Sequence, residues 1–172
     1  VLQTVNVSLP LNLAMYKWIE GSQVNLVKDR DIPQALQFVH QLHENCRSEP
    51  AQQIPDAGEA CLSLYNLRQQ IERKEQNLRS VAGLCPKLQG FLDNEFAPVK
   101  RHYQKSLAQQ FPLIDLETKL AKKWQTLSPS DFGFHNSLRK ADGSLVWLDF
   151  EYFGWDDPVK LICDFCGILG LN

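Results

Sequence analysis

The feature that most constrains this chain is a short apolar run bounded by turn residues and acids in the last third of the sequence. Residues 145–148 read Leu-Val-Trp-Leu, which predicts a buried strand. Residues 136–139 can pair with that run, because the intervening segment 141–144 contains Asp-Gly, a strong hairpin turn signal. Such a hairpin carries Asn136 at its start and Asp149 at its end back to one mouth.

A second acid, Asp131, precedes the predicted hairpin by five residues, so two carboxylates and an amide are expected at the mouth. Carboxylate and amide oxygens are ligands that hold Mg²⁺, which in turn clamps phosphate oxygens. A further carboxylate can accept the proton of an attacking hydroxyl. We assign that base role to Asp131 and the metal-ligand roles to Asn136 and Asp149, while Glu151 could reach a second metal or an acceptor amine. Each residue alone has an ordinary interpretation as a turn cap, a loop residue or a solvent-exposed strand end.

The same stretch resembles the catalytic and metal loops of the aminoglycoside phosphotransferase and choline kinase family, which is related to protein kinases. That family carries His-Gly-Asp-Leu-His-x-x-Asn, a short hairpin, Ile-Asp-Phe-Glu, Gly-x-x-Asp-Pro and then an aspartate on a helix. The matching segments here are 128–136 (SPSDFGFHN), 148–151 (LDFE) and 154–158 (GWDDP), followed by Asp164. The resemblance implies that Asp131 is the catalytic base and that Asn136 and Asp149 bind magnesium. It also implies that Asp164 is structural and bonds the catalytic-loop backbone from within.

The chain departs from the family pattern at two loop positions. Pro129 stands where the family has its first His, and Ser130 stands where it has Gly. The missing His affects the bracing of the loop more than its chemistry. His135 directly precedes Asn136 and is not equivalent to the second His of the family motif.

An earlier segment resembles the hinge of the same kinase family. Residues 14–21 (AMYKWIEG) are similar to the last strand of the small lobe, which a Glu-Gly pair follows. By this likeness the main-chain groups of Lys17 and Ile19 would face the adenine of ATP, because the adenine edge needs one donor and one acceptor. An ordinary edge strand is the alternative.

Between these segments the sequence predicts mostly helices. They are expected at 31–45, at 57–82, at 88–107 with an interruption at Pro98, and at 116–124. We therefore predict an α+β, mainly helical fold: a protein-kinase-like large lobe with a catalytic-loop β-hairpin and the last strands of the small lobe. Residues 1–20 would end the small lobe and form the hinge, and residues 21–172 would form a C-terminal lobe truncated just after Asp164 begins its helix.

Composition restricts the partners of the chain. The 18 Lys and Arg residues against 20 Asp and Glu residues give a net charge of −2, so no overall positive field attracts nucleic acid or an acidic membrane. No apolar run approaches membrane-spanning length. The five scattered cysteines argue against a disulfide framework and favour the cytoplasm. The oligomeric state is left open.

These observations predict an ATP- and Mg²⁺-dependent phosphotransferase that acts on a hydroxyl of a small molecule. No Gly-rich phosphate loop or strand lysine precedes the hinge segment, so we expect the chain to be a fragment that is inactive by itself. Acids at 151, 156 and 157 would suit a cationic acceptor, although Asp156 and Asp157 could instead cap a helix. Two rival functions are a non-catalytic kinase-like binding module and a metal-dependent phosphohydrolase.

Overall fold

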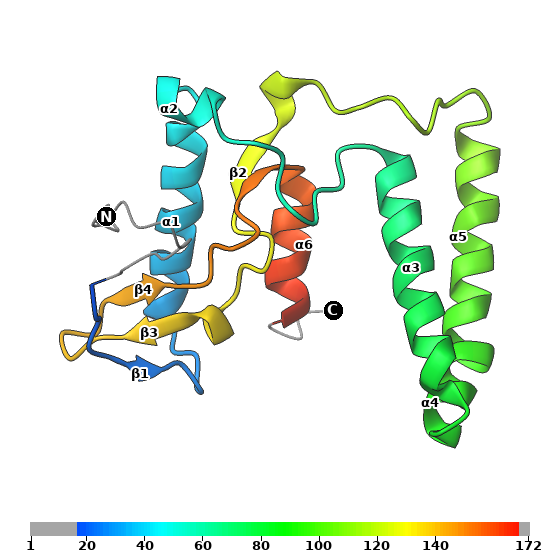
Figure 1. Cartoon of the computed structure of the whole chain (residues 1–172), viewed down its shortest axis with the longest axis horizontal. Helices are drawn as coiled ribbons and strands as arrows, with labels where there is room; N and C mark the ends of the chain where they lie inside the picture. The colour runs from blue at the N-terminus through cyan, green and yellow to red at the C-terminus, as the bar shows by residue number, and fades with distance from the viewer. Residues whose placement is uncertain (1–16, 169–172) are drawn as a thin grey trace, which may run out of the picture.

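The predicted hairpin is present and sits at one side of the structure (Figure 1). The computed structural model describes residues 17–168, in which about 52% of the chain is helical and the strands form small antiparallel sheets. Strands β3 (Ser137–Arg139) and β4 (Leu145–Trp147) pair with Leu138 opposite Val146. Strand β1 (Ser22–Gln23) adds to the other edge of β3. The hairpin prediction is therefore confirmed, including its Asp-Gly turn.

A second, two-stranded sheet holds the loops around the hairpin. Strand β2 (Thr126–Ser128) pairs antiparallel with β5 (Gly154–Asp156), and all six residues are buried. Trp155 forms the centre of this pair and is only 2% exposed. The sequence did not predict these strands, because three-residue strands have no periodicity to detect.

Helix α1 (Asp31–Asn45) confirms the prediction for that segment and packs against the hairpin and β2. Its buried face contains Ala35 and Leu42, and the short helix α2 (Glu49–Gln52) follows it. Helix α6 (Pro158–Ile168) closes the body from the other side. An aromatic cluster joins these parts, with Phe132 as its centre: its ring lies 4.8 Å from Trp147 and 5.0 Å from Phe165.

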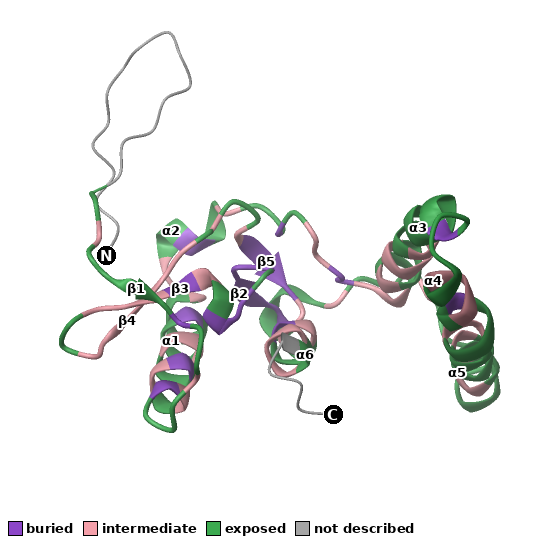
Figure 2. Cartoon of the chain, turned by 90° about the horizontal axis from the view of Figure 1, so that it is seen from below, coloured by how far each residue is buried: buried purple, intermediate pink, exposed green. Residues whose placement is uncertain are grey.

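The remaining helices form an arm that stands apart from the body (Figures 1 and 2). This helical arm consists of α3 (Leu64–Ala82), α4 (Pro86–Phe91), the π-helix η1 (Leu92–Phe96) and α5 (Ala97–Gln110). In both views α6 lies between the hairpin and the arm. Two backbone hydrogen bonds close the base of the arm, from Leu120 N to Leu62 O and from Tyr65 N to Leu116 O.

Three helix predictions need correction. The helix predicted at 57–82 begins only at Leu64, because the backbone of residues 57 and 58 bonds to the β5 region. The segment 88–107 stays helical through Pro98. The helix widens into a π turn just before the proline, where Ala97 N bonds to Leu92 O, and this turn accommodates the absence of a backbone N–H at Pro98. The helix predicted at 116–124 is wrong: only the single 3₁₀ turn η2 (Lys122–Trp124) forms there.

The expected hinge is only partly within the described residues. Lys17 and Ile19 belong to an irregular segment, and the strand expected before them lies outside residues 17–168. Gly21 passes close to the hairpin, since a Cβ built on it would lie 3.0 Å from the Cβ of Leu138. The segment after the expected hinge therefore runs along β3, the first strand of the hairpin.

Candidate active site

The hairpin brings the residues before and after it to one mouth. The main-chain N–H of Leu148 donates to the carbonyl of Asn136 at 2.8 Å, so the two ends of the hairpin are directly hydrogen-bonded. Asn136 ends the 3₁₀ turn η3 (Phe134–Asn136), and Asp149 follows Leu148 and is exposed. The backbone thus brings the amide residue and the acid residue to the same edge of the sheet.

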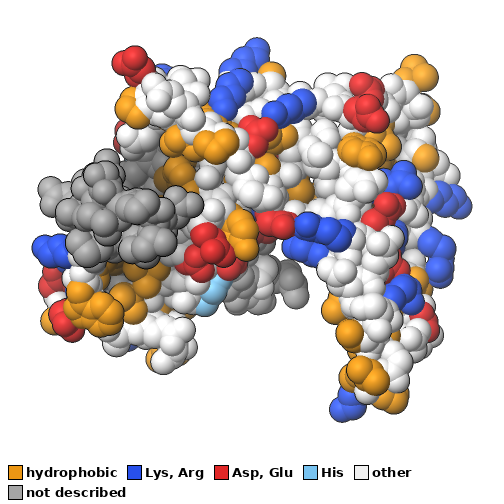
Figure 3. All heavy atoms as spheres, viewed as in Figure 1, with side chains coloured by type: hydrophobic (Ala, Val, Ile, Leu, Met, Phe, Trp, Pro, Cys, Tyr) orange, Lys and Arg blue, Asp and Glu red, His pale blue; other side chains and the backbone are white. Residues whose placement is uncertain are grey.

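Asp131 lies at this mouth and contacts two neighbours. The side-chain amide of Asn136 donates to Oδ2 of Asp131 at 3.1 Å and to the main-chain oxygen of Asp131 at 3.0 Å. Nε2 of His135 lies 3.2 Å from the same Oδ2. Figure 3 shows acidic side chains beside a histidine over this end of the hairpin. More than half of the Asp131 side chain is exposed, so the carboxylate remains open to a ligand.

His135 is a member of this site that the sequence interpretation did not assign. It was set aside because its position differs from that of the second His in the family motif. Its spacing of four residues from Asp131 is the signal that could find it, since the turn η3 places His135 beside the loop residue Asp131.

Backbone strain is concentrated on both sides of the mouth. Among the described residues, Ser130 (φ 68°) and Asp149 (φ 61°) are the non-glycine residues with positive φ. This left-handed conformation costs an ordinary residue about 1–2 kcal/mol and is held only where the surroundings fix it. Ser130 occupies the position where the resembling family has glycine, the residue that adopts this conformation without penalty. The strain therefore coincides with the two loops that carry the predicted base and a predicted metal ligand.

The side chains at the mouth carry the types of oxygen atom that bind magnesium. Within residues 17–168, no group of three or more His, Cys, Asp or Glu side chains is close enough to hold a metal. A site at this mouth would instead use the Asn136 amide oxygen and the Asp149 carboxylate. Mg²⁺ is commonly bound by one or two carboxylates together with substrate phosphates, because it keeps several of its ligands from water or substrate. The residues present fit such a sparsely coordinated ion.

The three acids expected to select a cationic acceptor lie in different environments from one another. Glu151 is exposed near the mouth, and its hydrogen bonding raises the pKa of the Tyr152 phenol. Asp156 is fully buried and accepts hydrogen bonds from the N–H groups of Cys61 and Asp157, so it cannot contact an acceptor. Asp157 accepts from Val159 N at 2.8 Å and caps α6, which confirms the capping alternative for this residue.

Asp164 does not have the bonding implied by the resemblance. Its carboxylate accepts a hydrogen bond from Nζ of Lys160 at 2.7 Å, one turn earlier on α6. Among the described residues, no main-chain N–H of the catalytic loop donates to it. Other groups support the loop instead: the hydroxyl of Ser128 accepts from Ser130 N at 3.0 Å, and Ser130 Oγ donates to Tyr152 O.

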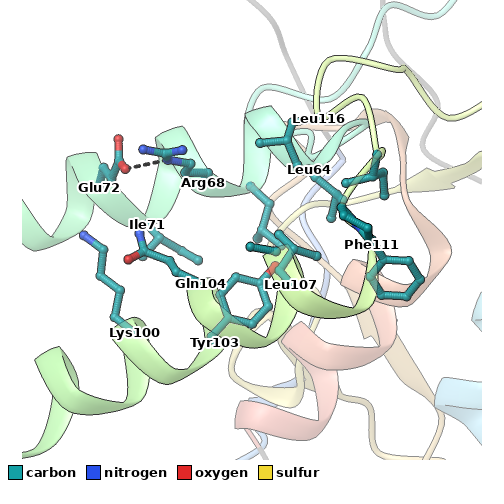
Figure 4. A pocket seen from close by; sticks show the side chains of 14 residues that line it. Leu64, Arg68, Ile71, Glu72, Lys100, Tyr103, Gln104, Leu107, Phe111 and Leu116 are labelled. Carbon is teal, nitrogen blue, oxygen red and sulfur yellow. Dashed lines mark hydrogen bonds and ion pairs between the residues drawn. The ribbon is translucent and has the colours of Figure 1, made fainter.

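A separate cavity of about 530 Å³ lies within the helical arm (Figure 4). Apolar side chains of α3 and α5 face each other across it, among them Leu64, Ile71 and Leu107. Arg68 and Glu72 form an ion pair at 2.8 Å at one end of it. The cavity shares no lining residue with the Asp131 cluster, so it is not part of the mouth of the hairpin.

Comparisons with protein-family models, curated proteins and solved structures gave no match. Among residues 17–168, the structure contains no helix with the length and apolar character that a membrane crossing requires.

Proposed function

We propose that this chain carries the catalytic and metal-binding loops of an ATP-dependent phosphotransferase that moves the γ-phosphate to a hydroxyl of a small molecule. The observation that supports the proposal is the contact between Asp131 and Asn136 at 3.1 Å. This contact lies at the end of the hairpin opposite its turn, where Leu148 bonds to Asn136 and leads into Asp149. A base, an amide and a second acid at one edge form the constellation that phosphoryl transfer needs.

Each residue has a distinct role in this proposal. The exposed carboxylate of Asp131 orients the acceptor hydroxyl and accepts its proton, and the Asn136 amide fixes that carboxylate. Asn136 and Asp149 would hold Mg²⁺, which supplies positive charge against the phosphate oxygens. Glu151 would reach a second metal or an acceptor amine. The main chain of Lys17 and Ile19 would contact adenine, which is consistent with the path of Gly21 along β3.

The experiment compares Asp149→Asn with Asp142→Asn, the same change at the opposite end of the same hairpin. Mg²⁺-dependent ATP binding by the chain is measured by calorimetry. Phosphoryl transfer to a panel of hydroxylated acceptors is measured with the protein that carries this chain. We expect Asp149→Asn to abolish Mg²⁺-dependent binding and transfer, while Asp142→Asn, whose carboxylate bonds only turn residues, leaves both unchanged.

The rival functions give different results in the same measurements. Mg²⁺-dependent nucleotide binding without transfer to any acceptor would indicate a binding module, which the replacement of the family His by Pro129 would favour. Phosphate release from a substrate without ATP would indicate a phosphohydrolase. Near-wild-type transfer by Asp149→Asn would contradict the metal assignment.

A further inference from the structure

Another cavity lies on the body, at the end of α1. It has a volume of about 320 Å³, and Trp155 of the buried strand β5 forms part of its wall. Its charged lining residues are all cations, namely Arg47 just after α1 and Lys122 and Lys123 of η2, and His43 near the end of α1 also lines it. Figure 3 shows Lys and Arg side chains gathered over η2 at the top of the molecule.

The cations of this cavity have no carboxylate partners among residues 17–168. The ion pairs of the described chain do not include Arg47, Lys122 or Lys123. The neighbouring acid Asp56 is already bonded to Lys119 at 2.7 Å. Like charges around one concave surface repel one another, and a bound anion removes that repulsion.

Lys122 is held in place by an aromatic ring. Its Nζ lies 3.3 Å from the ring centroid of Trp155, which is 2% exposed. Burial lowers the pKa of Lys122, while the Asp56 carboxylate acts in the opposite direction. A cation that packs on a buried ring loses little side-chain freedom when it binds an anion, because its position is already fixed.

A buried amide adds a polar group that is not cationic. Gln125 also lines the cavity and is 6% exposed, and its Nε2 donates to Leu120 O at 2.7 Å. Its Oε1 is buried without a hydrogen-bond partner in the described chain. A buried acceptor without a donor is costly, and this side chain belongs to the wall of the cavity.

We propose that this cavity binds a small phosphate monoester. A bound phosphate would contact the side chains of Arg47, Lys122 and Lys123, which line the cavity. Arg and Lys are the residues that bind phosphate through charge-assisted hydrogen bonds. The cavity volume lies at the lower end of the range for small-molecule sites. It is larger than a phosphate ion alone needs.

This site is separate from the proposed active site, and the inference does not depend on that function. The lining residues of the cavity do not include Asp131, Asn136 or Asp149. The two sites are nevertheless connected by one strand, since β2 begins directly after Gln125 and ends three residues before Asp131. An occupant of the cavity would therefore lie beside Gln125, the residue that directly precedes this strand.

The test is calorimetric titration of the chain with glycerol 3-phosphate and, separately, with inorganic phosphate, in EDTA at fixed ionic strength. EDTA removes metal-dependent binding at the hairpin mouth, and the fixed ionic strength removes general screening effects. We expect saturable 1:1 binding of glycerol 3-phosphate. Tighter binding of the ester than of the inorganic ion would identify an organic phosphate as the ligand. Equal affinities would keep the anion site but assign it to free phosphate.

The variants separate this cavity from other basic surfaces. The double variant Arg47→Gln/Lys123→Gln should bind at least tenfold more weakly, while Lys123→Arg should retain binding. A matched double variant of exposed cations on the arm, Lys87→Gln/Arg101→Gln, should bind like wild type. Lys122 is left unchanged because its packing on Trp155 supports the fold. No saturable binding of either probe, or unchanged affinity in a folded Arg47→Gln/Lys123→Gln variant, would overturn the proposal.

Discussion

The buried carboxylate of Asp31, at the start of α1, accepts a hydrogen bond from the guanidinium of Arg139, at the end of β3. Asp31 also accepts from the main-chain N–H of Lys28 at 2.7 Å. The Asp31 side chain is fully buried, and that of Arg139 is 14% exposed. This pair fixes the hairpin to α1 across 108 positions of sequence, and so it fixes the sheet that carries the proposed site.

Removing the charge of Asp31 should destabilise the fold. Asp31→Asn leaves the Arg139 guanidinium buried without its counter-ion, which costs about 3 kcal/mol of unfolding free energy. The matched control is Arg68→Gln, which breaks an exposed ion pair on the arm and should lower the unfolding free energy far less than Asp31→Asn does. Urea unfolding followed by circular dichroism measures both values. Equal losses in the two variants would show that the buried pair does not fix the hairpin.

The carboxylate of Asp31 should also make the unfolding free energy depend on pH. Burial alone would raise the pKa of Asp31, but the bonds from Lys28 and Arg139 outweigh it and hold the pKa below 3.8. Because the folded pKa is below the unfolded value, the ionised group stabilises the fold at higher pH. That contribution is lost as pH falls through the folded pKa, in a window below about pH 4.

The measurement is the unfolding free energy of wild type and Asp31→Asn between about pH 3 and pH 7. Other acids also have lowered pKa values, among them Glu59 and Asp142, so both proteins should lose stability in acid. The difference between the two curves isolates Asp31. It should be constant near neutrality and shrink at the acid end, and a difference that grows in acid would contradict the assignment.

Gly154 should be intolerant of any side chain. A Cβ built on it would lie 2.5 Å from Ala57 N and 2.6 Å from Pro55 O, because β5 hydrogen-bonds directly to that loop. Gly154→Ala should therefore destabilise the protein by about 2 kcal/mol or more. Gly83→Ala is the control, since nothing lies within 4 Å of its Cβ position. Thermal unfolding of both variants is the test, and a stable Gly154→Ala would show that the loop can move away.

Backbone strain at Ser130 can be measured with a pair of substitutions. Ser130→Gly and Ser130→Ala both remove the hydroxyl that donates to Tyr152 O, so their difference reports the backbone alone. Glycine adopts the φ of 68° freely, and alanine does not. We expect the glycine variant to be more stable than the alanine variant by about 1 kcal/mol. Equal unfolding free energies would show that the loop relaxes.

The base assignment predicts a large effect on rate and a small effect on stability. Asp131→Asn keeps the shape of the side chain but cannot accept a proton, so turnover should fall by about 10²–10⁴-fold. His135→Gln removes only a neighbour of that carboxylate and should lower the rate less. The rates are measured with the protein that carries this chain, with thermal unfolding as the control for folding. A rate for Asp131→Asn near that of wild type would exclude it as the base.

The elements that sequence reasoning predicted are those with strong local signals. Helix α1 has a repeating apolar face, and the hairpin has an Asp-Gly turn between two apolar strands. The contact between Leu148 N and Asn136 O followed from the same turn, because the hairpin returns its two ends to one place.

The elements that were missed depend on distant contacts. Strands β2 and β5 are three residues long and pair across 26 or more positions, so neither has a pattern of its own. The segment before Leu64 has helix-forming residues, yet Ala57 N bonds to Trp155 O and draws it into an extended path. In the sequence, Asp156 looks like a helix-capping residue on the surface. Its carboxylate is instead buried and accepts a hydrogen bond from Cys61 N, a contact between distant parts of the chain.

The way in which the helical arm joins the body has an evolutionary consequence. The chain leaves and returns through neighbouring segments, and the bonds between Leu62 and Leu120 and between Tyr65 and Leu116 close the gap between them. An arm attached in this way can be lengthened, shortened or exchanged by recombination while the register of the hairpin is preserved. Selection could therefore reshape the arm and its cavity independently of the mouth of the hairpin.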